Sequence, residues 1–203
     1  PMSLVSVADH IQALFSQQAA VKDLLFKVEC ASNLPTTVLM DSFRLNQVLM
    51  NLCGNAIKFT EQGEVSLSIK ATLSPGCQSK VDIAIEVVDT GKGIPSDQLR
   101  VIFNAFEQVR NQKTSEYGGT GLGLAITKQL VKLMGGELTA FSAGEGQGAT
   151  FSVLFSGVEV CQLAPLNLGH IGVIEKETIQ FQPARILVVD DIEYNRELMM
   201  SYL

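Results

Sequence analysis

Two amides and an amine lie at helical spacing in the stretch LNQVLMNLCGNAIKFT, Leu45–Thr60. Asn51, Asn55 and Lys58 are three or four residues apart, so a helix places them in one stripe, away from its apolar face. An amide oxygen can ligate Mg²⁺, and an ammonium group can neutralise phosphate oxygens. The stripe therefore predicts one wall of a phosphate site, although a solvated polar flank explains the three residues equally well when they are taken alone.

A carboxylate, Asp89, comes at the end of a predicted strand and is followed by Gly91 and Gly93. Glycines let the backbone approach a ligand closely, and a carboxylate only accepts hydrogen bonds. A buried acceptor at this position suits the amino group of adenine and rejects guanine, which presents an oxygen there. The pattern predicts an adenine pocket, and the alternative is a simple Asp-Thr-Gly turn.

Three glycines, Gly119, Gly121 and Gly123, run into a helix predicted over Leu124–Met134. Free N–H groups at a helix N-terminus favour phosphate. The run is not a Walker loop, because Gly-Lys-Ser/Thr is missing, and a polar loop rather than a strand precedes it, unlike a Rossmann fingerprint. It fits a phosphate loop and the hinge of a flexible lid, and both interpretations stay open.

The polar segment Asn104–Gly118 is long and weakly patterned, which is typical of a functional or mobile loop. Phe103 and Phe106 bracket its start. As apolar anchors they would let such a loop dock over a ligand, and as ordinary core residues they would belong to a short helix. The sequence leaves both interpretations open.

The elements that must position these residues alternate between helical and strand patterns. The first predicted helix carries its apolar face on Leu4, Val7, Ala8, Ile11, Leu14 and Phe15. Asp41 is a good N-cap for the helix that bears the polar stripe. The predicted helices are Ser3–Gln18, Leu45–Thr60, Asp97–Phe103 and Leu124–Met134, and the predicted strands are Leu24–Cys30, Val38–Met40, Glu64–Leu73, Val81–Val88, Glu137–Ser142 and Ala149–Phe155.

Composition sets further bounds on the function. The 203 residues are 46% hydrophobic and carry a net charge of −6, which argues against nucleic acid as the main partner. Four cysteines lack metal-ligand spacing and are typical of a reducing compartment. No apolar run is long enough to span a membrane. We therefore expect a cytoplasmic piece, with any inner-membrane anchor in other parts of a longer parent protein.

Together these motifs resemble the catalytic, ATP-binding domain of histidine kinases, over about Ser3–Phe155. The matching motifs are Asn51-x-x-x-Asn55-Ala-Ile-Lys58-Phe59 (N box), Asp89-x-Gly91-x-Gly93 (G1 box), Phe103-x-x-Phe106 (F box), Gly119-Thr-Gly121-Leu-Gly123-Leu (G2 box) and Gly146-Gln-Gly148-Ala-Thr150. The resemblance implies the GHKL, or Bergerat, α/β fold: a two-layer α+β sandwich with a mixed sheet and helices on one face.

The resemblance also implies ATP and Mg²⁺ as ligands and a role for each matching residue. Asn55 would ligate Mg²⁺, Asn51 and Lys58 would contact phosphates, and these three would form the catalytic set. Asp89 would read adenine, with support from Thr150. The rest of the implied nucleotide site comprises Phe59, Gly91, Gly93, Ile94, Phe103, Phe106, Gly119, Thr120, Gly121, Leu122, Gly123 and Leu124.

The implied domain organisation is a catalytic domain over residues 1–156, a linker over 157–183, and the truncated start of a receiver domain over 184–203. The last part, ILVVDD…NR, is similar to the first strand and helix of receivers, with Asp190 and Asp191 as the acidic pair. This order indicates a hybrid sensor histidine kinase. His10 lacks the context of a phosphoacceptor, so we expect that histidine in a dimerisation domain absent from this chain, and no autophosphorylation by the fragment alone.

Other functions share the predicted fold. Gyrase- and MutL-type ATP hydrolases carry a Glu one turn before the metal-binding Asn, where this chain has Asn51, and an amide cannot act as a general base. A serine kinase of the anti-sigma type is disfavoured by the receiver-like tail. A degenerate domain that binds nucleotide as a regulatory or docking module is the main alternative. Glu116 supports it weakly, because hybrid kinases often carry a basic residue there, although Arg110 and Lys113 supply charge nearby.

Overall fold

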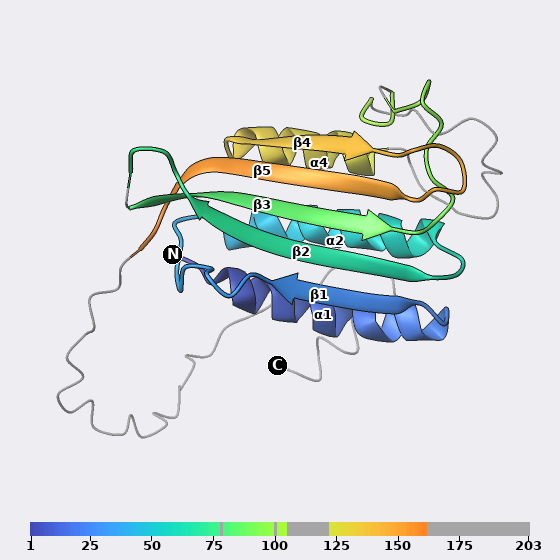
Figure 1. Cartoon of the computed structure of the whole chain (residues 1–203), viewed down its shortest axis with the longest axis horizontal. Coiled ribbons are helices and arrows are strands. Elements are labelled where there is room, and N and C mark those ends of the chain that lie inside the picture. Colours follow the sequence, from blue (N-terminus) through green and yellow to red (C-terminus); the bar gives the residue numbers. More distant parts are fainter. Residues whose placement is uncertain (78, 100, 105–121, 162–203) are drawn as a thin grey trace, which may run out of the picture. The chain divides into compact units, whose positions relative to one another are not determined.

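The computed structural model describes residues 1–77, 79–99, 101–104 and 122–161. Its centre is a five-stranded sheet in the order β1-β2-β3-β5-β4 (Figure 1). The strands are β1 Leu25–Cys30, β2 Glu64–Leu73, β3 Lys80–Asp89, β4 Gly136–Phe141 and β5 Ala149–Glu159. β1 pairs with β2 in parallel and the other neighbours pair antiparallel, so the sheet is mixed.

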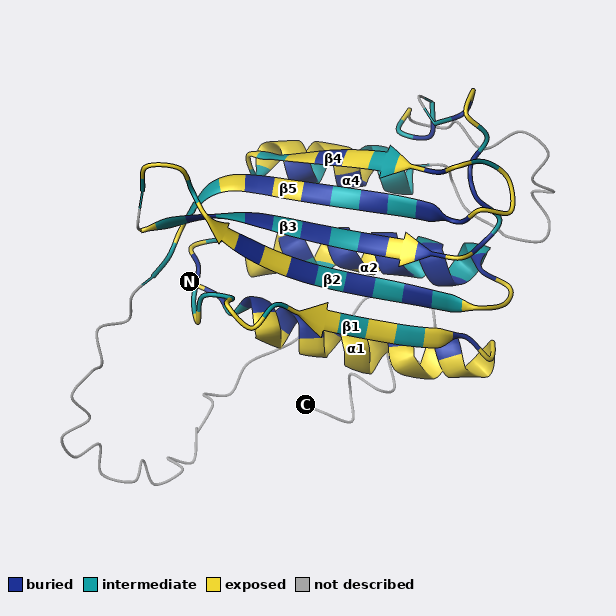
Figure 2. Ribbon diagram, viewed as in Figure 1, coloured by how far each residue is buried: buried dark blue, intermediate teal, exposed yellow. Residues whose placement is uncertain are grey.

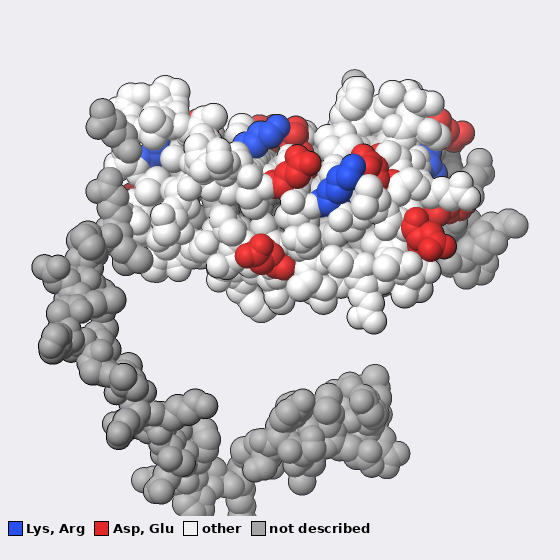
Figure 3. Space-filling model, turned by 60° about the horizontal axis from the view of Figure 1, so that its bottom comes forward, with Lys and Arg blue, Asp and Glu red and all other residues white. Residues whose placement is uncertain are grey.

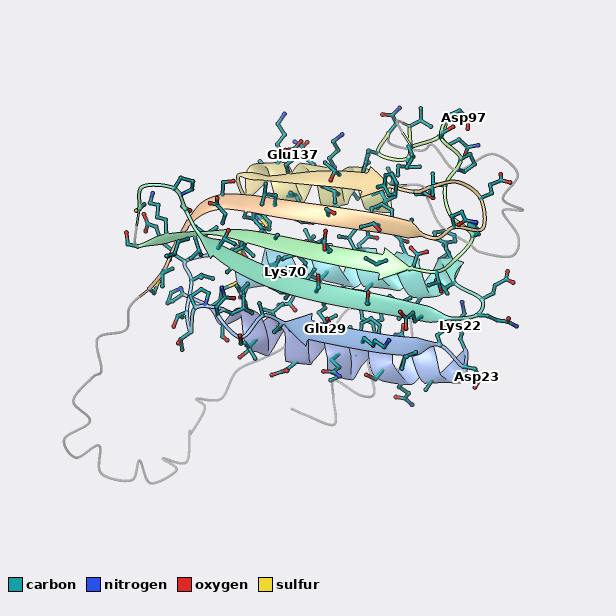
Figure 4. The ribbon with its side chains drawn as sticks, in the orientation of Figure 1. Lys22, Asp23, Glu29, Lys70, Asp97 and Glu137 are labelled. Atoms are coloured by element: carbon teal, nitrogen blue, oxygen red, sulfur yellow. The ribbon has the colours of Figure 1, made fainter. Side chains whose placement is uncertain are left out.

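Three helices lie side by side against one face of this sheet (Figure 1). They are α1 Leu4–Val21, α2 Ser42–Phe59 and α4 Gly123–Leu133. The opposite face carries no helix among the described residues, and Figure 4 shows Glu29, Lys70 and Glu137 on its strands. This arrangement confirms the predicted two-layer sandwich with helices on one face.

Helix α2 forms where the sequence predicts it. Asp41 caps its first turn, because its Oδ1 accepts a hydrogen bond from the backbone N–H of Arg44 at 3.0 Å. One side of the helix is buried against the sheet, and each such aliphatic side chain contributes about 1.5–3 kcal/mol. The buried residues are Leu45, Val48, Leu49, Leu52, Cys53, Ala56 and Ile57. This packing holds the polar stripe in place on the flank of α2.

The central strands alternate between buried and more accessible residues, as Figure 2 shows. Val65, Leu67 and Ile69 of β2 face the helices, whereas the residues between them lie on the open face. On the surface in Figure 3, acidic and basic side chains are scattered among uncharged ones. That surface carries no broad basic patch of the kind that nucleic acid requires.

Three local predictions were wrong. Val38–Met40 is not a strand, because only Val38 pairs, through single bridges to Met2 and Val160. The described residues of Asp97–Phe103 form hydrogen-bonded turns rather than a helix. Leu14 is 37% exposed, because the buried stripe of α1 continues through Phe15 to Ala19 and leaves Leu14 at its edge.

Several predictions fall outside the described residues: Phe106, most of the long loop, Gly119 to Gly121, and the receiver-like segment 184–203. No helix in the described part of the chain is long and apolar enough to cross a membrane.

Candidate nucleotide-binding site

The polar stripe of α2 is partly buried at its first residue, where it meets α4. The Asn51 side chain donates from Nδ2 to the Thr127 hydroxyl at 2.7 Å. Thr127 in turn donates to the carbonyl oxygen of Gly123 at 2.9 Å. One hydrogen bond therefore joins α2 to α4, and a second one, within α4, connects Thr127 to the first residue of that helix.

Gly123 begins α4 at a point of close approach. A Cβ at this position would lie 2.6 Å from Oδ1 of Asn51, which is too close for a real contact. Of the glycine-rich run, the structure describes Leu122, Gly123 and Leu124, and it places all three at the start of α4 beside the stripe. The N-box helix therefore meets the last residues of the G2 box at the start of α4.

Asn55 lies one turn further along α2 and differs from Asn51 in the hydrogen bonding of its side chain. Its side chain is partly buried and makes no hydrogen bond to any other described residue. Lys58 lies on the next turn, with its Nζ 5.1 Å from the centroid of the Phe59 ring. The stripe thus offers an unengaged amide next to an ammonium group that lies near an aromatic face.

A lysine from another helix holds the end of α2. Lys22, which caps α1, donates from Nζ to three backbone carbonyl oxygens: those of Ile57 at 2.8 Å, Lys58 at 3.2 Å and Thr60 at 3.3 Å. A cation at a helix C-terminus satisfies carbonyl groups that lack intrahelical partners and opposes the negative end of the helix dipole. No local pattern predicts this contact, because Lys22 and its partners are 35 to 38 residues apart in the chain.

Asp89 is a buried carboxylate at the end of β3, with 7% of its surface exposed. Its Oδ1 accepts hydrogen bonds from the backbone N–H groups of Gly91 at 2.9 Å and Ala149 at 3.2 Å. Burial raises the pKa of Asp89, and the two hydrogen bonds oppose that shift. The structure therefore fixes the side chain in a sheltered position, with acceptor capacity left for a ligand.

Thr150 does not reach Asp89 as predicted. In the β3–β5 pair, Asp89 lies opposite Ala149, whereas Thr150 lies opposite Val88. Because successive side chains of a strand point to opposite faces, Thr150 lies on the open face of the sheet and Asp89 on the helix face. The support for Asp89 comes from the backbone of Ala149, one residue earlier.

The loop after Asp89 is held by the turn between β4 and β5, and we call residues 142–149 the clamp. Ser142 accepts a hydrogen bond from the Ile94 N–H at 3.0 Å and donates to the Gly148 carbonyl at 2.6 Å. Gly148 donates its N–H to the Gly91 carbonyl at 3.0 Å, and Gly146 donates to that of Lys92 at 2.6 Å. Sequence reasoning missed Ser142, because nothing local marks a serine that acts on a residue 48 positions away.

Gly91 and Gly93 lie so close to neighbouring backbone atoms that neither position has room for a side chain. A Cβ at Gly91 would collide with the carbonyl oxygen of Phe59 at the end of α2. Gly93 has a φ of 68°, and a Cβ there would collide with the carbonyl oxygen of Gly144 in the clamp. These glycines let the Asp89 loop pass between α2 and the clamp.

The remaining predicted residues lie around this loop. Ile94 is 8% exposed and belongs to the hydrophobic core. Phe103 is partly buried and packs against this core, and the Lys128 Nζ lies 4.7 Å from the centroid of the Phe103 ring. A second lysine, Lys92, lies in the loop itself, with its Nζ 4.2 Å from the Phe59 ring centroid. Lys92 was not predicted as a site residue.

The fold and this site define a nucleotide-binding domain, and comparison with known proteins agrees. Residues 40–157 match the family model of histidine kinase-, DNA gyrase B- and HSP90-like ATPases. The chain therefore belongs to that family. Within it, the chain corresponds to the catalytic ATP-binding domain of sensor histidine kinases, as the sequence motifs predicted.

The relatives support this assignment. The chain is 39% identical over 182 residues to the signal transduction histidine-protein kinase BarA of Shigella flexneri, covering 84% of this chain and 19% of BarA. It is 33% identical to the aerobic respiration control sensor protein ArcB of Escherichia coli K12, covering 100% of this chain and 25% of ArcB. The chain thus spans a quarter or less of these relatives.

A solved structure also matches. Full-length ShkA in complex with AMPPNP superposes with a TM-score of 0.65 and 33% identity, over 79% of this chain and 31% of ShkA. This likeness confirms the fold of the described residues.

Proposed function

We propose that this domain binds Mg-ATP and donates the γ-phosphate to a histidine in a dimerisation domain outside this sequence. The observation that carries the proposal is Asp89, a carboxylate at the end of β3 that is 7% exposed and held by two backbone N–H groups. Among the described residues, Asp89 accepts these two hydrogen bonds and forms no ion pair with a lysine or arginine. A ligand that donates a hydrogen bond gives this carboxylate a function.

Base recognition follows from the acceptor character of Asp89. Its Oδ1 is already engaged with the clamp and the loop, and the carboxylate retains further lone pairs. The adenine amino group can donate to them, whereas guanine places an acceptor there and would leave both groups unpaired. We therefore expect strong preference for ATP over GTP.

Asn55 is the residue we assign to Mg²⁺. Its amide makes no hydrogen bond to another described residue, so its oxygen can become a ligand without breaking a contact. Mg²⁺ commonly keeps several waters and combines one or two protein ligands with substrate phosphates. The described residues contain no group of three His, Cys, Asp or Glu side chains placed for a metal. A nucleotide-borne Mg²⁺ fits this sparse ligand set, and the ion would offset charge on the phosphates.

We assign the phosphates to Asn51, Lys58 and the N-terminus of α4. Thr127 and Gly123 fix Asn51 at that N-terminus, where N–H groups favour anions. Phosphoryl transfer depends mainly on positioning and charge neutralisation, which amide and ammonium groups supply. Neither Asn51 nor Asn55 can act as a general base, so activation of water for rapid hydrolysis is not expected. Gly119, Thr120 and Gly121 remain predicted parts of this phosphate site.

We also propose the remainder of the hybrid kinase organisation. The segment ILVVDD over 186–191 is similar to the first strand of receivers, which supports a receiver domain that begins near residue 184 after a linker over 157–183. The partners would be that receiver and the histidine-bearing dimerisation domain, and the parent would act at the cytoplasmic side, where ATP is available.

Phosphotransfer to a supplied histidine-bearing dimerisation hairpin, from ATP labelled at the γ-phosphate, tests the proposal. We expect label on the histidine with the wild-type chain, very slow release of free phosphate, and no transfer with Asn55→Ala. Glu86→Gln, on the open face of β3, is the matched control and should transfer normally. Tight Mg-ATP binding without transfer to several related hairpins would instead indicate a nucleotide-binding docking module. Fast hydrolysis by the chain alone would contradict the kinase assignment.

A further inference from the structure

Lys92 and Lys58 converge on one aromatic ring from two different segments. The Nζ of Lys92 lies 4.2 Å from the centroid of the Phe59 ring, and the Nζ of Lys58 lies 5.1 Å from it. The two nitrogens are therefore separated by no more than the sum of these distances. Lys58 belongs to the stripe of α2, whereas Lys92 belongs to the loop that carries Asp89.

The backbone fixes Lys92 from both sides. Its N–H donates to the carbonyl oxygen of Phe59 at 3.2 Å, and its own carbonyl accepts from the Gly146 N–H at 2.6 Å. The residues on either side are glycines, and the Thr90 hydroxyl is occupied with the Glu64 N–H at 3.0 Å. Lys92 is thus the side chain that this loop extends over Phe59, and its position is set by α2 and the clamp.

The two ammonium groups act on each other through their charges. Burial lowers the pKa of Lys92, the positive charge of Lys58 lowers it further, and Glu61 opposes both effects. The face of an aromatic ring attracts cations and helps to hold both lysines near Phe59. A polyanion between or beside them would remove the repulsion and form charge-assisted hydrogen bonds with both.

We propose that Lys92 is a second cation of the nucleotide site, which binds the phosphates of the nucleotide together with Lys58. This inference rests on the proposed function and adds to it Lys92, the unspecified position between Gly91 and Gly93 of the G1 box. It connects the two halves of the site, because the loop that reads the base would also contact the phosphates. The ligand class that it predicts is an adenine nucleotide with at least two phosphates.

NMR titration of the isotope-labelled chain with Mg-ADP and with adenosine tests this inference, because it measures weak and tight binding alike. Lys92→Gln should raise the dissociation constant for Mg-ADP about tenfold and leave that for adenosine unchanged. Lys92→Arg, which keeps the charge, should recover most of the Mg-ADP affinity. Lys70→Gln, on the open face of β2, is the control and should bind as the wild type does.

Two results would overturn the inference. One is an equal loss of adenosine and Mg-ADP affinity in Lys92→Gln, which would place Lys92 in the base pocket. The other is unchanged affinity for both ligands. Failure of the proposed nucleotide binding is distinct, because it would appear already as a wild-type chain that binds neither ligand. The amide spectrum of each variant shows whether the fold is retained, so a folding defect cannot imitate either result.

Discussion

The two halves of the candidate site are built differently. On the base side, Asp89 is held by backbone N–H groups from two segments. The clamp holds the same loop, because Ser142 accepts a hydrogen bond from it and the N–H groups of Gly146 and Gly148 donate to it. On the phosphate side, Asn51 is tied to α4, but Asn55 makes no hydrogen bond to other described residues. A rigid acceptor suits discrimination between bases, whereas an unengaged amide suits a metal ion that arrives with its substrate.

The largest expected stability effect comes from the clamp. Ser142→Ala removes the acceptor for the Ile94 N–H and the donor to the Gly148 carbonyl, and both backbone groups lie in a buried region. A buried polar group left without a partner costs about 1–3 kcal/mol. We expect urea unfolding to show a loss in that range and ATP affinity to fall with it. Ser152→Ala, on the open face of β5, should change stability by less than about 0.5 kcal/mol. Equal effects of the two substitutions would mean that the clamp does not organise the base side.

The two asparagines of α2 offer a matched pair on the phosphate side. Asn51→Ala breaks the hydrogen bond to Thr127, so we expect a loss of about 1 kcal/mol in the free energy of unfolding. Asn55→Ala breaks no contact with described residues and should leave stability unchanged or slightly raised, because alanine favours a helix. Mg-ATP binding should nevertheless weaken at least tenfold in Asn55→Ala. If magnesium-free ATP weakened by the same factor, the metal role of Asn55 would be wrong.

Lys22 holds the end of α2, which the loop after Asp89 also contacts through the Lys92 N–H and the Phe59 carbonyl. Lys22→Met keeps much of the aliphatic side chain but removes the ammonium group from three carbonyl oxygens, and such helix-end contacts contribute about 0.3–1 kcal/mol at the surface. We expect a loss of that size in thermal unfolding, reduced at high salt. Lys27→Met removes only a surface ion pair to Glu64, and serves as the control. A Lys22 effect no larger than that of Lys27 would show that the cap contributes nothing.

The smallest expected effect is the pH dependence that Asp89 contributes. Burial raises the pKa of Asp89 in the folded state above its value in the unfolded state. At a pH between these two pKa values, the folded chain keeps a proton on Asp89 that the unfolded chain has released. Asp89 therefore favours the fold below the unfolded pKa, and this contribution is lost as the pH rises through the folded one. At neutral pH, without nucleotide, Asp89→Asn should be at least as stable as the wild type, with a flatter dependence of melting temperature on pH. A lower melting temperature for Asp89→Asn at every pH would contradict this.

Local patterns were sufficient to predict the fold. Helical spacing and the Asp41 cap placed α2, and alternation placed β2 and β3 almost to the residue. The wrong prediction of a strand at Val38–Met40 arose because a strand forms only when several consecutive residues find pairing partners. Val38 has strand character but pairs with one residue on each side, so no strand forms.

The site was predicted less completely, for a similar reason. Thr150 was misassigned because a shift of one residue in a strand moves a side chain to the other face, and register depends on the partner strand. Ser142, Lys22 and Lys92 act through contacts with residues distant in the chain, and their types alone carry no signal of that. Motif spacing thus predicted the groups that we propose to face the ligand, while the residues that hold those groups became visible only in the structure.

Thermal unfolding with different nucleotides tests the central claim most directly. Wild type, Asp89→Asn and the control Glu86→Gln would be melted with Mg-ATP, with Mg-GTP, and with ATP plus a chelator. A ligand at about one hundred times its dissociation constant adds roughly 2.7 kcal/mol of stability. The account predicts a clear rise in melting temperature with Mg-ATP for wild type and Glu86→Gln, little with Mg-GTP, a smaller rise with chelator, and none for Asp89→Asn. Equal stabilisation by ATP and GTP, or an undiminished ATP shift in Asp89→Asn, would show that Asp89 does not read adenine.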